Sequence, residues 1–241
     1  MTRPAFNLKT IFRLILGTVL IVSLGLLGFG LYVVPTARTA AMMSSSHCHL
    51  KQIGLAFHNY HDVYGSFPPG AIVRENGDRM LSWQTLLLPY LNLKPLYERI
   101  NQEEPWTSPT NQIVYSEPIP LCSHPGAKPA GAFSAYAGNS HVFQINRALN
   151  LREFTDGTSN TILIGEVSAG FKLWGDPTNI RDPALGLGKT PEQFGGTFPN
   201  VTLFLMADGA VRKVKSEVDP TVLKALATPN GGEKLDDFWD K

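Results

Sequence analysis

The first 61 residues contain no acidic side chain, although the whole sequence of 241 residues has 20 Asp and Glu residues. This segment carries a charge of +5 from its basic residues, and because the whole chain is +1, the rest carries −4. A basic segment ahead of a mildly acidic domain favours contact with a membrane at one end, and it argues against nucleic acid as the main partner. The basic residues are Arg3, Lys9, Arg13, Arg38 and Lys51.

Residues 15–34 lack charge of either sign. As a helix they extend for about 30 Å, which matches the hydrocarbon core of a bilayer. We expect a transmembrane helix that makes the lipid bilayer a partner, with residues 1–14 as a cytoplasmic amino terminus because their basic residues stay inside. Residues 35–241 then form one extracytoplasmic domain of a single-pass protein of the cytoplasmic membrane. A cleaved signal peptide is the alternative, since Thr39 and Ala41 suit a cleavage site.

Catalytic signatures are also missing. The sequence has no Gly-x-Ser-x-Gly, His-Glu-x-x-His, phosphate-loop or Gly-x-Gly-x-x-Gly motif. Asp156, Glu166 and Asp208 supply carboxylates for a glycosidase pair, but acids beside turns are usually solvated. We therefore expect a protein that is not an enzyme.

The sequence has only two cysteines, Cys48 and Cys122. In an exported domain such a pair predicts a disulfide, and closing a loop of about 75 residues contributes about 4 kcal/mol in the chain-entropy model. The bond would clamp a helix to the domain. In a cytoplasmic domain both thiols would stay reduced.

Two groups of side chains suggest a metal. His47, Cys48, His49, His58 and His61 lie close together in sequence, but on a helix only His58 and His61 share a face, so no ligand set converges. We expect His58 and His61 to have a structural role at the end of the helix.

The second group is Asp156, Asn160 and Glu166, whose oxygen atoms suit calcium. Their spacing does not fit an EF-hand loop, and the segment from Asp156 to Asn160 is more typical of a turn. We expect no cofactor, with calcium at these three residues as the alternative.

Hydrophobic periodicity predicts an α+β fold. Apolar positions recur every three or four residues in a helix that needs a cover, at Leu50, Ile53, Phe57, Tyr60 and Tyr64. Strands are expected at 132–137, 161–167, 201–206 and 210–215, the last two joined by an Asp208-Gly209 hairpin turn. Ser82 and Asp219 are expected to cap helices, whereas 103–128 and 171–200 are expected to be irregular.

Several blocks together resemble a bacterial family known as domain of unknown function 1559. They are LKQIGLAFHNYHDVYGSFPPG, SWQTLLLPYLNLKPLYERIN, the PLCS segment that holds Cys122, SAYAGNS, FTDGTSNTILIGE, FLMADGAVR and ALATPNGGE, in that order. Members are similar to type IV pilin-like proteins and type II secretion pseudopilins, so the resemblance implies a long amino-terminal helix packed on an antiparallel sheet. The family-motif positions are His58, Tyr60, His61, Asp156, Gly157, Asn160, Glu166, Asp208 and Gly209.

The sequence departs from this family in two places. Members carry a prepilin leader motif and a Glu early in the apolar helix, but here no acid precedes Asp62. This predicts a permanently anchored relative and not a processed filament subunit. Many members also have a signature of His, nine residues and Asp-Gly, and Phe198 occupies the His position.

The functional expectation is a membrane-anchored, pilin-like or pseudopilin-like envelope protein that acts by protein interaction, with components of a secretion or pilus-like machine or with other envelope proteins. The alternative is an extracytoplasmic solute- or carbohydrate-binding protein that uses the irregular segments. Aromatic side chains at Trp83, Trp106, Trp174 and Tyr136 suit sugar stacking, with core packing as the other interpretation.

Overall fold

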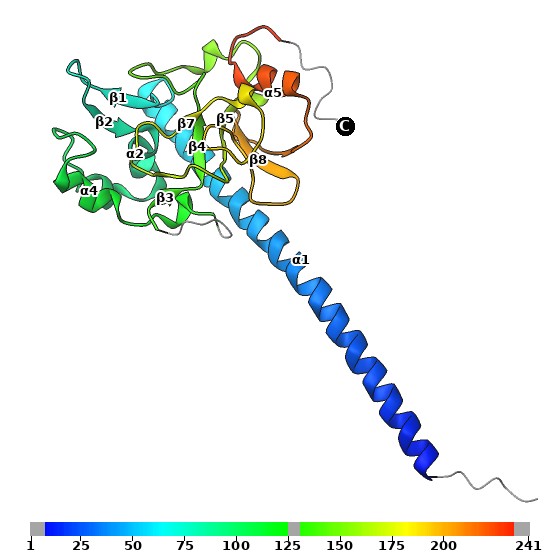
Figure 1. Ribbon diagram of the computed structural model, residues 1–241. Coiled ribbons are helices and arrows are strands. Elements are labelled where there is room, and N and C mark those ends of the chain that lie inside the picture. The colour runs from blue at the N-terminus through cyan, green and yellow to red at the C-terminus, as the bar shows by residue number, and fades with distance from the viewer. Residues whose placement is uncertain (1–7, 125–130, 234–241) are drawn as a thin grey trace, which may run out of the picture. The chain divides into compact units, whose positions relative to one another are not determined.

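The structure is a computed structural model, and it describes residues 8–124 and 131–233 (Figure 1). The side chains at 8, 10, 25–28 and 30–32 lie outside the description as well. The chain divides into two compact units, Met1–Met43 and Ser44–Lys241. We describe each unit by itself.

Helix α1 (Leu8–Tyr64) begins in the first unit and ends in the second, with Pro35 inside it. Among the side chains that the structure describes, no helix combines the length and the apolarity needed to cross a membrane. The predicted span 15–34 includes residues 25–28 and 30–32, whose side chains lie outside the description.

The second unit is α+β, as predicted. Its strands are β1 (Ala71–Val73), β2 (Arg79–Ser82), β3 (Phe133–Ser134), β4 (Tyr136–Asn139), β5 (Ile162–Glu166), β6 (Lys172–Leu173), β7 (Ile180–Arg181), β8 (Val201–Met206) and β9 (Val211–Lys215). Its further α-helices are α2 (Trp83–Leu87), α3 (Lys94–Tyr97), α4 (Pro109–Tyr115) and α5 (Pro220–Ala227).

The central sheet has five strands in the order β7-β4-β5-β8-β9. Its pairs are antiparallel except for β4 and β7, which run parallel. Two small antiparallel sheets, β1-β2 and β3-β6, complete the strands. The predicted antiparallel arrangement is therefore confirmed for most pairs, and the parallel edge strand comes from the segment that was expected to be irregular.

The sheet is covered on both faces. On one face α1 comes so close to β8 that a Cβ atom on Gly54 would lie 2.8 Å from Cδ1 of Leu205. On the other face Leu223 and Leu226 of α5 share a buried cluster with Phe204 (Figure 1). Successive side chains of a strand point to opposite faces, so Phe204 and Leu205 serve different layers. The central sheet is the predicted cover of the helix.

The predicted apolar stripe of the helix is confirmed for Leu50, Ile53 and Phe57, which are buried. Tyr60 is half-buried, and Tyr64 is 61% exposed, so the stripe ends earlier than predicted. The reason is that the helix continues past its cover, where the tilted rings of Tyr64 and Tyr60 pack together with centroids 4.4 Å apart.

The predicted caps and the predicted hairpin turn are confirmed. Ser82 Oγ accepts a hydrogen bond from Thr85 N, and the Asp219 carboxylate accepts one from Thr221 N. Gly209, with φ of 79°, closes the turn between β8 and β9, which suits a residue without a Cβ atom.

The prediction of an irregular segment at 103–128 is wrong in part, because it contains α4. Ser108 caps this helix, and the buried Asn111 side chain donates to the carbonyl oxygens of Asn101, Glu104 and Pro105. One buried side-chain amide thus supplies hydrogen bonds to three backbone carbonyl groups of the preceding loop, and it holds the helix against that loop.

Phe57 is the residue on which the contact between helix and domain centres. Its ring lies 5.7 Å from Trp83, 6.0 Å from Phe67 and 5.4 Å from Phe143, measured between ring centroids. Phe57 is fully buried, so its removal leaves a cavity between α1 and the loops that pack on it.

We expect Phe57→Ala to lower the free energy of unfolding of the second unit by about 3–5 kcal/mol. The control is Leu55→Ala on the same helix, where the side chain is 63% exposed and a change within about 0.5 kcal/mol is expected. Urea unfolding of the detergent-solubilised chain, followed by tryptophan fluorescence, measures both. Equal losses for the two variants would contradict this packing.

Candidate functional site

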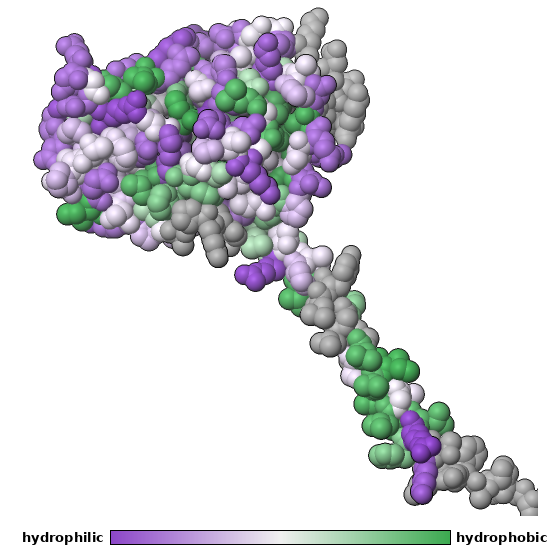
Figure 2. All heavy atoms as spheres, in the orientation of Figure 1, coloured by the Kyte–Doolittle hydropathy of each residue, from purple (hydrophilic) through white to green (hydrophobic). Residues whose placement is uncertain are grey.

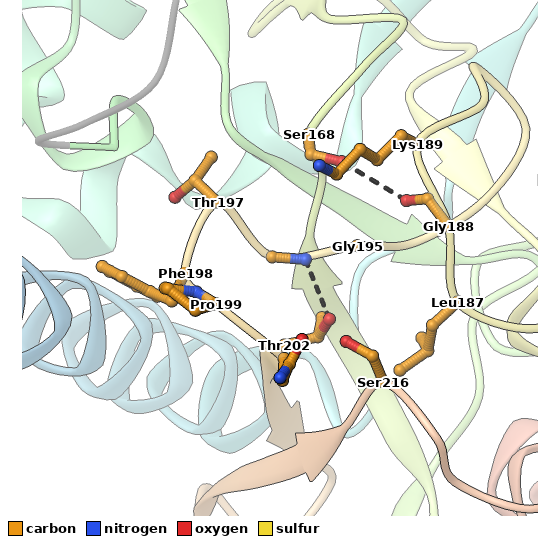
Figure 3. A pocket seen from close by; sticks show the side chains of 12 residues that line it. Ser168, Leu187, Gly188, Lys189, Gly195, Thr197, Phe198, Pro199, Thr202 and Ser216 are labelled. Atoms are coloured by element: carbon orange, nitrogen blue, oxygen red, sulfur yellow. Dashed lines mark hydrogen bonds between the residues drawn. The ribbon is translucent and has the colours of Figure 1, made fainter.

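A cavity of about 650 Å³ opens beside β8, and we call it the β8 cavity (Figure 3). Most of its lining comes from residues 187–202, within and just after the segment that was expected to be irregular. The lining residues are Ser168, Leu187, Gly188, Lys189, Gly195, Gly196, Thr197, Phe198, Pro199, Asn200, Thr202 and Ser216.

Backbone hydrogen bonds hold the rim of the cavity in place. Gly188 N donates to Phe194 O at 2.9 Å, and Gly195 N donates to Glu166 O at 3.0 Å. Gly196 N donates to the Thr202 hydroxyl at 2.8 Å. A Cβ atom on Gly195 would lie 2.0 Å from the carbonyl oxygen of Gly188, so this close approach requires glycine.

A buried polar network lies behind the cavity wall. Its centre is Glu166, whose side chain is 1% exposed. Oε1 of Glu166 accepts a hydrogen bond from Ser46 Oγ at 2.6 Å, and Oε2 accepts one from Leu203 N at 2.9 Å. Ser46 Oγ also lies 2.9 Å from the Tyr136 hydroxyl, and His124 Nε2 lies 3.3 Å from Glu166 Oε1. These contacts replace the hydrogen bonds to water that the carboxylate lost on burial.

Burial acts on the pKa of one member of this network, Tyr136. It raises the pKa of the Tyr136 hydroxyl, and the nearby Glu166 carboxylate raises that pKa further. Tyr136 therefore stays neutral and available as a hydrogen-bonding group over the physiological pH range.

The network and the cavity meet at His124. Thr197 Oγ1 lies 3.0 Å from His124 Nε2, and the Phe198 ring packs on the imidazole with centroids 4.7 Å apart. Both Thr197 and Phe198 line the cavity. The residue at the family's signature His position is thus a wall residue that covers a buried histidine and carboxylate.

The three residues considered for calcium are held in two different networks. Glu166 belongs to the polar network, whereas the Asp156 carboxylate accepts hydrogen bonds from Gly231 N at 2.6 Å and Gly232 N at 3.0 Å. Asn160 Nδ2 donates to the Asp156 carbonyl oxygen at 3.1 Å, as in the predicted turn. Within the described ranges, no group of three or more His, Cys, Asp or Glu side chains is arranged to hold a metal ion.

The predicted disulfide is wrong, because Cys48 and Cys122 are both free thiols. On α1, Ser46 and Leu50 are buried against the domain. Cys48 lies two residues from each of them, so its side chain is on the opposite side of the helix and is exposed. Cys122 is buried, which raises the pKa of its thiol to about 12, and Gln84 Nε2 lies 3.6 Å from its sulfur.

The family-motif histidines lie at the helix end. The rings of His58 and His61 pack on Phe67, with centroid distances of 5.8 Å and 5.5 Å. The Asp208-Gly209 turn packs on the same helix, because Lys51 Nζ donates to Gly209 O at 2.8 Å. The Asp208 carboxylate meanwhile accepts from Ala210 N within the turn. These motif positions join the helix to the sheet.

The aromatic residues considered for sugar stacking are mostly in the core. Trp83, Trp174 and Tyr136 are at most 1% exposed, so core packing describes them. Trp106 is half-buried, and its ring packs on Tyr115. The individual lining residues were not predicted from the sequence, but most of them lie in segment 171–200, one of the two irregular segments that the solute-binding alternative uses.

Fold and site together define an α+β protein in which a helix is joined to an antiparallel-rich sheet through a buried carboxylate network beside an open cavity. Residues 35–141 and 126–192 match the family model described as protein of unknown function (DUF1559). These matches span well over half of the chain, which belongs to this family, as the sequence blocks predicted. No curated protein and no solved structure is similar enough to match it.

We expect Glu166→Gln to lower the free energy of unfolding by about 1–3 kcal/mol, because Gln replaces one of the two oxygens that accept from Ser46 Oγ and Leu203 N with an NH₂ donor. Urea unfolding measures the loss. The matched control is Glu217→Gln, an exposed acid for which a change within about 0.5 kcal/mol is expected. A double-mutant cycle with Ser46→Ala should show coupling, and strict additivity would refute the contact.

Proposed function

We propose that this protein is a membrane-anchored envelope protein that acts by binding other proteins and catalyses no reaction. The observation that carries the anchor is the run of exposed apolar side chains in the first unit (Figure 2). They are Phe12, Leu14, Ile15, Leu16, Val19, Leu20, Ile21, Val22, Leu24, Phe29 and Val34.

These side chains occupy every side of the helix. Four consecutive residues complete a helical turn, and the stretch from Val19 to Val22 is exposed throughout. A helix that is apolar all round needs an apolar environment on all sides, which a lipid bilayer supplies. The basic residues before the segment support an orientation with the amino terminus in the cytoplasm.

The pilin-like part of the proposal is supported by the family resemblance and by the way residues 44–64 of α1 pack on an antiparallel-rich sheet. No acid precedes Asp62, so the helix lacks the carboxylate through which pilin subunits are thought to pair. We therefore propose a permanently anchored relative that contacts secretion-like or pilus-like components without entering a filament.

The non-enzymatic part is supported by the burial of the serine, histidine and glutamate that lie together in the polar network. Ser46, His124 and Glu166 are each at most 6% exposed, and they are held in contacts that stabilise the fold. A substrate reaches them only if the packing around them opens, either between helix and sheet or at Thr197 and Phe198 of the cavity wall.

A second candidate function is solute binding, and the β8 cavity is the observation that favours it. Its volume of about 650 Å³ lies within the range of about 300–1,000 Å³ that is typical of small-molecule sites. Titration of the detergent-solubilised chain with a panel of neutral and acidic sugars tests this candidate.

The exposed thiol of Cys48 reports where the second unit lies. We expect a membrane-impermeant maleimide to label intact spheroplasts at Cys48, because this thiol is exposed and Cys122 is buried. The chain should also stay in the membrane pellet after a carbonate wash. Cys48→Ser should abolish labelling until denaturation exposes Cys122, and labelling only after lysis would contradict the proposed orientation.

Protein partners are tested by photo-crosslinking in the native membrane, with a photoreactive amino acid in place of exposed Leu55 or, as a control, of buried Leu50. We expect Leu55 to give discrete adducts to an envelope protein, because an exposed apolar side chain on the outer face of α1 is free to contact it. Leu50 should give internal crosslinks only. A Leu55 variant that gives no adduct, from a protein that runs as a monomer in detergent, would count against the interaction role.

A further inference from the structure

We propose that the β8 cavity binds a sugar acid, a ring that carries hydroxyl groups and one carboxylate. The proposal rests on the second candidate function, solute binding, and assigns a ligand class to it. Three properties of the lining support this class: its combination of hydroxyl and apolar side chains, its single type of charge and its hydrogen-bonded rim.

The lining of the cavity combines hydroxyl groups with apolar side chains. Ser168, Thr202 and Ser216 contribute hydroxyl groups, and Leu187, Phe198 and Pro199 contribute apolar surface. Figure 3 shows these side chains around the backbone of Gly195. A pyranose ring is amphipathic in the same way, since its C–H face packs on apolar side chains while its hydroxyl edge exchanges hydrogen bonds.

The charge of the lining favours an acidic sugar over a neutral one. Among the described residues that line the cavity, Lys189 carries the charge, and no Asp or Glu accompanies it. No salt bridge joins Lys189 to a described carboxylate. A lysine ammonium is a compact, mobile charge that pairs with a carboxylate at the mouth of a site.

Some polar groups of the site form hydrogen bonds within the protein, and others are available to a ligand. The Thr202 hydroxyl accepts from Gly196 N, and the Ser168 hydroxyl donates to Gly188 O at 3.3 Å, so both are fixed in position. Within the described chain, no hydrogen bond engages the Ser216 hydroxyl or the Asn200 side-chain amide. These two groups and Lys189 remain for a ligand, and the fixed rim keeps the ordering cost of binding low.

The test is calorimetric titration of the full chain in detergent with galacturonate, glucuronate, galactose, glucose and acetate. We expect a hexuronate to bind with a Kd of about 0.1 mM, or about −5.5 kcal/mol, at least tenfold more tightly than its neutral sugar or acetate. A trigalacturonide presents the same acidic unit within a polymer, and comparing its Kd with that of galacturonate tells which source the site prefers.

Lys189→Met should weaken hexuronate binding by tenfold or more and leave the neutral sugar unaffected. Lys224→Met is the control, because this exposed lysine on α5 does not line the cavity. Ser216→Phe fills the opening from an exposed position and should abolish binding. Urea midpoints of the three variants, expected to match the unmodified chain, establish that each is folded.

The outcomes separate the ligand class from solute binding itself. Equal affinity for galactose and galacturonate, unchanged by Lys189→Met, would overturn the sugar acid and leave solute binding standing. Binding of acetate as tightly as galacturonate would overturn the sugar ring. If no compound binds at 10 mM, roughly −2.7 kcal/mol, both proposals fail, whereas the membrane-anchored role has its own tests.

Discussion

The close approach of α1 to the central sheet is the constraint on which the rest of the second unit depends. Gly54 lets the helix lie directly on Leu205, since a Cβ atom at this position would lie 2.8 Å from Leu205 Cδ1 and that side chain would have to move. The closeness brings Lys51 Nζ within 2.8 Å of the Gly209 carbonyl oxygen at one end of the contact. At the other end it brings Ser46 Oγ within 2.6 Å of Glu166. A helix one ångström further away would lose both hydrogen bonds, and the buried carboxylate would lose a donor.

This contact gives a physical meaning to the motif positions of the family. The Asp208-Gly209 turn lies under the helix, where a Cβ atom on Gly209 would meet His58 Nε2 at 3.4 Å. Glu166 is held by donors from the helix and from β8 at once. Gly209 and Glu166 are therefore motif positions at which the helix is joined to the sheet. Such residues are costly to bury singly and favourable as a complete set.

The β8 cavity is connected to this contact through its own wall. Phe198 covers His124, which lies 3.3 Å from Glu166, so cavity wall and helix attachment share one polar network. The rim itself depends on backbone bonds of Gly195 and Gly196 to Glu166 and Thr202. The cavity rim and the contact between α1 and the sheet thus share hydrogen bonds through Glu166.

The sequence by itself determined the features that depend on neighbouring residues. The tertiary structure decided which side of a helix faces the sheet and which distant segments come together. Ser82 and Asp219 cap their helices, and Gly209 closes its hairpin, because each acts within a few residues of itself. The family was likewise readable from ordered blocks of sequence. The predicted pairing of Cys48 with Cys122 was wrong because it depended on which side of α1 faces the sheet. Ser46 and Leu50 are on the buried side, so Cys48, two residues from each, is on the exposed side. The β8 cavity arises from loop residues brought together with β8, and no local pattern encodes that distance.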